Sequence, residues 1–286
     1  MIPNAPLRAP DGFPVLASVS VGPDQEACCL WTANDADPDG YRGAAGAVTQ
    51  QDATGAVWLS AELSRPLPRY PMVQPHPLGW VVVGARCDRL EDNALVFDQG
   101  GQLLAAGRVG DGVEEVYTTH NGELWVSYFD EGVFGDVLAA SGCVRWRISD
   151  DYQITPEWQL CYPDMADCYA MNVTDQAIYV CPYTDFPVIV IKDGRSTILE
   201  NDDVAGPSAI VTDGERMVII GAYRHPDQIA LGTLKTGRFR AEKKASLRVE
   251  GARFKEINRL CGRGTRLHAF DAGGRWWSAT LDELDV

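Results

Sequence analysis

Residues 115–129 read EVYTTHNGELWVSYF and form the clearest hairpin signal in the chain. Aromatic and β-branched residues alternate with polar ones on both sides of Asn121 and Gly122. An Asn-Gly pair between two such runs is typical of a tight turn joining antiparallel strands. The same pattern returns around residues 175–176 and 213–214. We interpret the three segments as the inner two strands of successive structural repeats.

Short apolar runs extend this pattern over the whole chain at intervals of roughly 40 to 50 residues, a period typical of β-propeller blades. The runs are residues 29–31, 81–83, 124–126, 178–180, 218–220 and 267–270. No helical periodicity of useful length competes with them. The sequence therefore predicts an all-β fold, a six-bladed β-propeller with mostly four-stranded antiparallel blades. Without a linker or low-complexity tract, residues 1–286 are expected to form a single propeller domain.

Shorter strand signals after each inner pair predict the outer strands. In the fifth blade these are residues 228–234 and 239–247, and the basic character of residues 235–253 suits an exposed edge strand. The sixth blade offers only three evident strands. Either residues 2–7 supply the fourth, as a poor strand because Pro3 and Pro6 lack an N–H donor, or this blade has three strands.

Composition restricts the classes of partner. Twenty-five basic and 40 acidic residues give a formal net charge of −15. A chain this acidic repels phosphate, so we expect neither nucleic-acid nor membrane binding. No apolar run is long enough to span a bilayer, and the first residues lack a leader pattern, which predicts a cytoplasmic protein. Its eight cysteines are then expected to be reduced thiols.

Four segments carry a family resemblance, namely residues 84–87, 122–135, 167–173 and 183–187. They are similar to uncharacterised propeller-like proteins of actinobacterial type. The resemblance implies a propeller fold but no known activity and no known catalytic residues.

Alignment of the predicted blades places a set of polar residues at one mouth of the central channel. These candidates for ligand binding are Arg86, Glu115, Asp130, Glu131, Asp167, Tyr169, Tyr183, Asp185, Tyr223 and His225. The set is acidic and rich in tyrosine. Carboxylates that accept hydrogen bonds, next to tyrosine rings on which a ligand packs, suit a sugar or other polyol. The same side chains also suit strand capping and ties between blades.

Metal binding is the second interpretation of this set. Asp130, Asp167 and Asp185 are the proposed ligands, and Ca²⁺ or Mg²⁺ is the expected ion because hard cations take oxygen donors. Asp130 and Glu131 follow a predicted central strand and precede Gly132, where a tight bend is expected. The alternative is a turn with solvated acids.

Three functions remain open from the sequence. The first is a propeller that binds a small molecule, a metal or a protein partner at the channel mouth. The second is a metal-dependent hydrolase of the lactonase type, supported by analogy of fold alone. The third is a structural scaffold without pocket chemistry. The sequence leaves the catalytic residues and the identity of any cofactor unknown.

Overall fold

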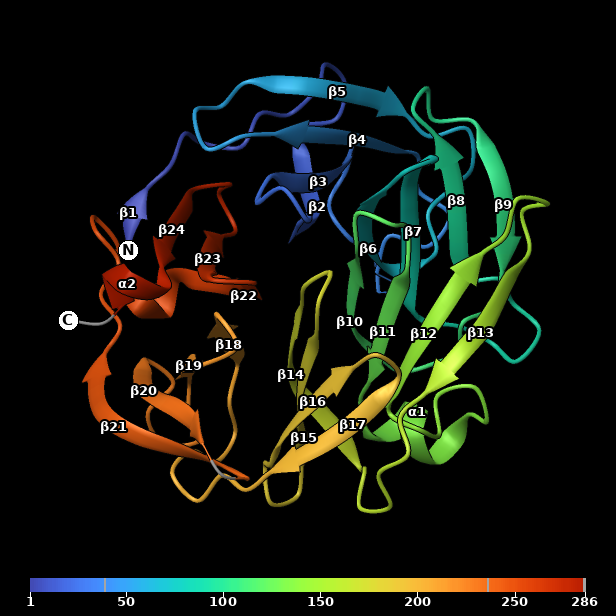
Figure 1. The fold of residues 1–286 in the computed structure, drawn as a ribbon. Helices are drawn as coiled ribbons and strands as arrows, with labels where there is room; N and C mark the ends of the chain where they lie inside the picture. The colour runs from blue at the N-terminus through green and yellow to red at the C-terminus, as the bar shows by residue number, and fades with distance from the viewer. Residues whose placement is uncertain (39, 236, 285–286) are drawn as a thin grey trace. The chain divides into compact units, whose positions relative to one another are not determined.

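The structure is a computed structural model, which describes residues 1–38, 40–235 and 237–284. These residues form six four-stranded antiparallel sheets. The chain divides into two compact units, Ala5–Leu160 and the combination of Met1–Asn4 with Cys161–Val286. Each unit contains three of the sheets (Figure 1). The predicted class, an all-β six-bladed propeller with four-stranded antiparallel blades, is confirmed, whereas the single domain stays a prediction.

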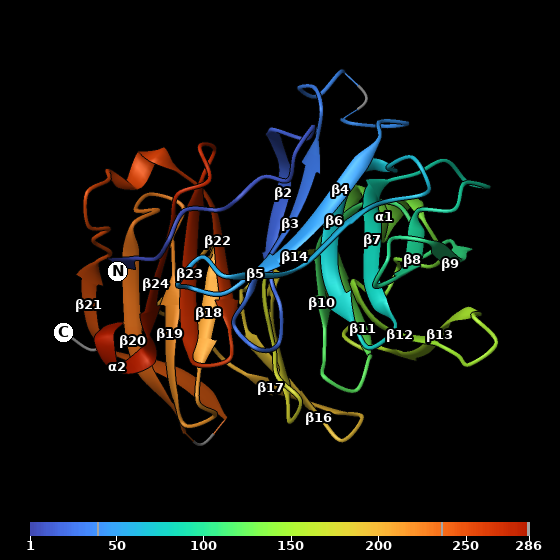
Figure 2. The ribbon, with the colours of Figure 1, turned by 90° about the horizontal axis from the view of Figure 1, so that it is seen from above.

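The unit of residues 5–160 holds the first three blades. The first contains β2 (Val15–Val21), β3 (Ala27–Thr32), β4 (Gly46–Gln51) and β5 (Val57–Glu62). The second contains β6 (Arg69–His76), β7 (Gly79–Arg86), β8 (Ala94–Asp98) and β9 (Leu103–Gly107). The third contains β10 (Val113–Thr118), β11 (Leu124–Tyr128), β12 (Cys143–Ile148) and β13 (Ile154–Gln159), with the short helix α1 (Asp130–Gly135) after β11. Strands β10 to β13 lie side by side in Figure 2.

The other unit holds three blades of the same kind. The fourth contains β14 (Asp167–Val173), β15 (Ile178–Tyr183), β16 (Val188–Lys192) and β17 (Arg195–Leu199). The fifth contains β18 (Ala209–Thr212), β19 (Arg216–Ile220), β20 (Gln228–Lys235) and β21 (Arg238–Ser246). The sixth contains β22 (Ile257–Arg263), β23 (Arg266–Asp271), β24 (Trp276–Thr280) and β1 (Ile2–Pro3), accompanied by the 3₁₀ turn η1 (Phe254–Glu256) and the short helix α2 (Leu281–Leu284).

The N-terminal strand completes the sixth blade, as one of the two alternatives predicted. Ile2 pairs with Ser278 and Pro3 with Trp277, so β1 is the outer strand beside β24 (Figure 1). The N-terminal ammonium of Met1 donates to the Arg248 carbonyl at 2.7 Å. An outer strand tolerates proline because it needs no N–H on its open side. The strand is only two residues long, shorter than the predicted segment 2–7.

Burial in the core explains why the second strand of each blade has an unbroken apolar sequence. Each is buried on both faces: β3, β7 and β11 have almost no exposed side chain in their central residues. Apolar residues of the second and third blades form one buried cluster, and those of the fourth and fifth form another. Loops at the strand ends therefore stand on rigid supports, which suits them to carry binding residues.

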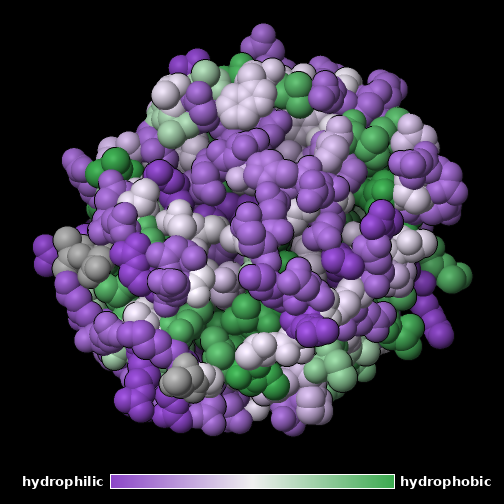
Figure 3. All heavy atoms as spheres, in the orientation of Figure 1, coloured by the Kyte–Doolittle hydropathy of each residue, from purple (hydrophilic) through white to green (hydrophobic). Residues whose placement is uncertain are grey.

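The surface and the cysteines agree with the composition. Hydrophilic side chains predominate on the face shown in Figure 3, and apolar side chains form smaller patches. All eight cysteines are free thiols, and Cys161 alone among them is exposed. No helix in the described ranges has the length and hydropathy needed to cross a bilayer.

Candidate functional site

The ten predicted ligand-binding residues fall in both units. Four belong to the unit of residues 5–160, namely Arg86, Glu115, Asp130 and Glu131. The other six belong to the second unit, namely Asp167, Tyr169, Tyr183, Asp185, Tyr223 and His225. The two groups are therefore described separately.

Arg86, at the end of β7, is held by two carboxylates. Its Nε and Nη2 atoms donate to both oxygens of Asp111, at 3.0 and 3.2 Å, and its Nη1 lies 2.5 Å from Glu131. The hydrogen bonds with Asp111, which the sequence did not single out, are the main cause that raises the pKa of Arg86. The guanidinium also lies 5.6 Å from the centre of the Phe129 ring. The Arg86 guanidinium is thus already paired with side chains of its own chain.

A second ion pair fixes the loop that carries Asp111. Arg108 pairs with Asp136, whose carboxylate also accepts the backbone N–H groups of Asp111 at 2.8 Å and Leu138 at 3.0 Å. Burial would raise the pKa of Asp136, but these donors outweigh it and lower the pKa below 3.8. The Tyr128 hydroxyl donates to the carbonyl of Val109 in the same loop. Of the predicted site residues in this unit, Arg86 and Glu131 therefore belong to a network of ion pairs and hydrogen bonds that includes the Asp111 loop.

The three predicted acids of this unit, Glu115, Asp130 and Glu131, differ from one another in burial. Glu115 is 5% exposed within β10, whereas Asp130 and Glu131 are exposed. The expected bend after a strand is instead the first turn of α1, where Asp130 accepts the N–H of Glu131 at 2.8 Å. Gly132 lies inside this helix and packs against Gly112, which leaves no room for a side chain. The prediction of a tight bend at Gly132 was wrong for this local reason.

In the second unit, three of the predicted tyrosines meet in an aromatic cluster. Tyr169 is the third residue of β14, Tyr183 ends β15 and Tyr223 lies in the loop after β19, so two neighbouring blades bring them together. Their ring centres lie 6.0 Å (Tyr169 to Tyr183) and 5.9 Å (Tyr169 to Tyr223) apart. Phe186 packs edge-on against all three rings, at 5.2 to 5.6 Å. We call Tyr169, Tyr183, Phe186 and Tyr223 the tyrosine cluster.

The cluster has a buried base and an exposed rim. Phe186 is only 5% exposed, whereas Tyr183 is 39% and Tyr223 is 58% exposed. The rings contact one another, so they form a platform and leave no cage between them. Such rings combine apolar faces with a polar end, which suits ligands that are themselves amphipathic.

Gly206 fixes the position of Tyr223. It has φ +77°, and a Cβ atom there would lie 2.8 Å from the Tyr223 ring. The Tyr223 N–H donates to the Ala205 carbonyl at 3.1 Å, which holds the loop after β19 against the loop before β18. A glycine is required here because the residue has a left-handed conformation and lies directly beneath an aromatic ring.

Two hydroxyls of the cluster form a hydrogen bond with each other. Tyr223 donates to the Tyr169 oxygen at 3.0 Å. Desolvation first, then this hydrogen bond and the nearby charge of Asp167, raise the pKa of Tyr223. A phenol both donates and accepts, so the pair keeps one O–H donor for a ligand.

Two of the predicted acids, Asp167 and Asp185, belong to the same unit as the tyrosine cluster. Asp167 pairs in register with Tyr183 across β14 and β15. Asp185 lies exposed between Tyr183 and Phe186, and its charge is among the causes, after burial and Asp164, that raise the pKa of Tyr162. His225 is exposed in the turn after Tyr223. The arrangement offers oxygen acceptors beside exposed aromatic rings.

Two contributors to the cluster were missed by the sequence analysis. Phe186 was expected only as part of a family-like stretch, and Gly206 was not considered. A glycine followed by strand β18, and an aromatic residue one position before a proline, were the available signals. Neither indicates a partner far away in the sequence.

Metal ligation is not established by the side chains. Among the described residues, no group of three or more His, Cys, Asp or Glu side chains is placed to hold a metal ion. Asp130 belongs to one unit, and Asp167 and Asp185 to the other. Binding of Ca²⁺ or Mg²⁺ by these three residues stays a prediction.

Comparisons with known proteins show the fold and no family. No protein-family model matches the sequence, and no curated protein matches it. Solved structures do match. A functionally unknown protein from Desulfotomaculum acetoxidans has a TM-score of 0.57 at 11% identity, over 95% of this chain and 84% of that one. A "putative 6-phosphogluconolactonase" from Bacteroides fragilis has a TM-score of 0.51 at 13% identity, over 87% and 75%. Virginiamycin B lyase from Staphylococcus aureus has a TM-score of 0.49 at 12% identity, over 96% and 97%.

These identities are low enough that the likeness concerns the fold alone. The chain is therefore a β-propeller whose structural neighbours include proteins of unknown function from bacteria. The resemblance to an actinobacterial-type family stays a prediction, and activity has to be argued from the residues themselves.

Proposed function

We propose that this propeller is a binding protein that holds a small, neutral, polyhydroxylated ligand on the tyrosine cluster. The observation that carries the proposal is a platform of four rings, in which buried Phe186 packs against the other three, while Tyr183 is 39% and Tyr223 is 58% exposed. Single exposed aromatic residues are common on protein surfaces, whereas contiguous exposed apolar groups mark interaction sites. An exposed, rigid set on loops of two blades is better suited to contact a ligand than to fill a core.

The polar groups beside the rings favour hydroxyl-bearing ligands. Asp167 and Asp185 supply acceptors, and the hydrogen-bonded pair of Tyr169 and Tyr223 supplies a donor. The C–H faces of a sugar ring would pack on the tyrosine faces while its hydroxyls meet these groups. With a net charge of −15, the protein disfavours phosphorylated or carboxylated sugars.

A titration calorimetry experiment tests the proposal with D-glucose, D-mannose and myo-inositol as probes. At least one is expected to bind with a Kd of about 1 mM or tighter. Tyr223→Ala should weaken that binding about tenfold or more, because a central aromatic contact contributes on the order of 2 kcal/mol. Trp58→Ala is the matched control, since Trp58 is a comparably exposed aromatic residue (51%) on β5.

Two results would contradict the proposal. One is the absence of binding by all three probes at millimolar concentration. The other is equal loss in Tyr223→Ala and Trp58→Ala. Binding of a macromolecule to the tyrosine platform in place of a polyol would favour the protein-partner alternative.

The lactonase-type hydrolase and the scaffold remain alternatives. Support for a hydrolase comes from the fold shared with the "putative 6-phosphogluconolactonase" proteins of Bacteroides fragilis and Bacteroides uniformis, each at 13% identity. Hydrolysis of a sugar lactone that requires Ca²⁺ or Mg²⁺ and disappears in Asp185→Asn would favour it. A scaffold would show neither ligand binding nor hydrolysis.

A further inference from the structure

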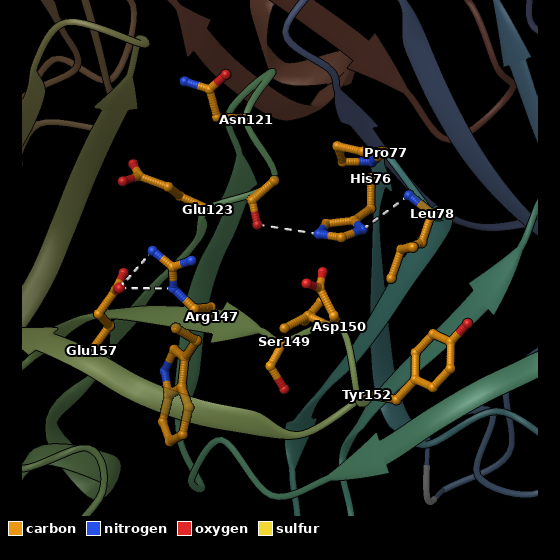
Figure 4. A pocket seen from close by; sticks show the side chains of 13 residues that line it. His76, Pro77, Leu78, Asn121, Glu123, Arg147, Ser149, Asp150, Tyr152 and Glu157 are labelled. Atoms are coloured by element: carbon orange, nitrogen blue, oxygen red, sulfur yellow. Dashed lines mark hydrogen bonds and ion pairs between the residues drawn. The ribbon is translucent and has the colours of Figure 1, made fainter.

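A pocket of about 620 Å³ lies among three turns of the unit formed by residues 5–160 (Figure 4). The turns join β6 to β7, β10 to β11 and β12 to β13, and they contribute residues 76–78, 121–123, 149, 150 and 152. Its volume lies within the range of roughly 300–1,000 Å³ found for small-molecule sites. None of its lining residues belongs to the tyrosine cluster.

Most of the charge around this pocket is neutralised internally. Arg147 pairs with Glu157 at 2.7 Å, as drawn in Figure 4, and Arg145 pairs with Glu123 at 2.8 Å. Two cations thus balance two anions. An anionic ligand would have to compete with Glu157 for Arg147, so the paired arginine is poorly suited to bind one.

His76 adds no charge at neutral pH. Its Nδ1 accepts the N–H of Leu78 at 3.2 Å, and its Nε2 lies 3.1 Å from the Gly122 carbonyl, to which it donates (Figure 4). This is the neutral tautomer with both ring nitrogens used. Burial is the main cause that lowers the pKa of His76, which keeps the ring uncharged.

Asp150 is the acidic residue of the pocket lining that takes part in neither of these ion pairs. Its carboxylate points toward His76 in the middle of the pocket (Figure 4). Across the described residues, neither an ion pair nor a hydrogen bond involves this carboxylate. The adjacent Asp151 differs, because it accepts the Ser149 hydroxyl. Leu78, Trp146 and Ile148 give the pocket apolar walls.

We propose that this pocket binds a small organic amine, whose ammonium group pairs with Asp150 and whose apolar part packs against Leu78 and Tyr152. One unbalanced carboxylate in a partly apolar pocket selects for one positive charge. Aromatic rings add to this selection because their faces attract cations. The site is separate from the polyol site proposed above and does not depend on it.

The test uses 2-phenylethylamine and its uncharged counterpart 2-phenylethanol as probes in calorimetric titrations. The amine should bind at least about tenfold more tightly than the alcohol, the ratio expected for a charge-assisted hydrogen bond. Asp150→Asn should abolish this preference. Asp151→Asn, which removes the same charge one residue away, should preserve it. Both residues are exposed in a turn, so both variants should fold.

Three results of these titrations would count against an amine site. Equal affinity for amine and alcohol, an unchanged preference in Asp150→Asn, or no binding of the amine at millimolar concentration would each overturn the proposal. Tyr223→Ala should leave amine binding intact. Failure of the polyol titrations would therefore leave this pocket unaffected, and the reverse also holds.

Discussion

Acidification from pH 7 to pH 5 should destabilise the protein through His268. This residue is fully buried in β23, which pairs with β22 on one side and β24 on the other. Its Nδ1 accepts the indole N–H of Trp276 at 3.2 Å, and the two rings stack at 5.8 Å. A proton on Nδ1 would place two donors face to face in a buried site.

The magnitude follows from the pKa of His268. Burial lowers this pKa from 6.5 to about 3, with smaller contributions from the positive charges of Arg266 and Arg263. Between these two values the unfolded chain binds a proton that the folded chain does not. The free energy of unfolding therefore falls by about 1.4 kcal/mol for each pH unit below 6.5. At pH 5, which is 1.5 units lower, the loss is about 2 kcal/mol.

Urea denaturation at pH 7, 6 and 5 measures this loss. His268→Gln keeps a hydrogen-bond acceptor but has no proton to gain, so its stability should decline much less over the same range. His225→Gln is the control, because His225 is exposed and should leave the pH dependence unchanged. Equal declines in the wild type and His268→Gln would refute the reasoning. A nuclear magnetic resonance titration showing His268 protonated in the folded protein at pH 5 would refute it as well.

Three further predictions concern local structure. Gly206→Ala should weaken polyol binding in calorimetry without unfolding the protein, because a Cβ atom 2.8 Å from the Tyr223 ring displaces that ring. Unchanged affinity would contradict binding of the polyol to the tyrosine cluster. Asp136→Asn should lower the free energy of unfolding by about 2 kcal/mol, since it breaks charge-assisted hydrogen bonds. The control Asp130→Asn, at an exposed residue, should change the free energy of unfolding little. Equal effects of the two substitutions would contradict the role given to the Asp136 network. A thiol reagent should label Cys161 quickly in the native protein and all eight cysteines after denaturation; fewer than eight would indicate disulfides.

The blades could be predicted from the sequence because each repeats a local signal. The turn at Asn121 and Gly122 and the runs of β-branched residues report strand pairing directly, through neighbours in the chain. Strand β6 was harder to recognise, since it contains Pro71 and Pro75. It lies at one edge of its sheet, where a missing N–H donor is tolerated.

The candidate site was only partly predictable. Register placed Tyr169, Tyr183 and Tyr223 at the same end of two blades, where the structure brings their rings together. Phe186 beneath them depends on the shape of a loop, which no periodicity encodes. Arg86 was expected to face a ligand, yet it pairs with Asp111 from a loop 25 residues away. Contacts between distant loops are set by packing, which a one-dimensional pattern does not report.

The most direct test of the polyol proposal is the response of individual tyrosine rings to a bound probe. Ring resonances of the ten tyrosines, labelled with ¹³C and assigned by substitution, would be followed during titration with the sugar that binds most tightly. We predict saturable shifts of Tyr169, Tyr183 and Tyr223, while exposed Tyr70 and Tyr152 stay unchanged. Shifts spread evenly over all exposed tyrosines, or confined to residues outside the tyrosine cluster, would contradict the proposed binding site.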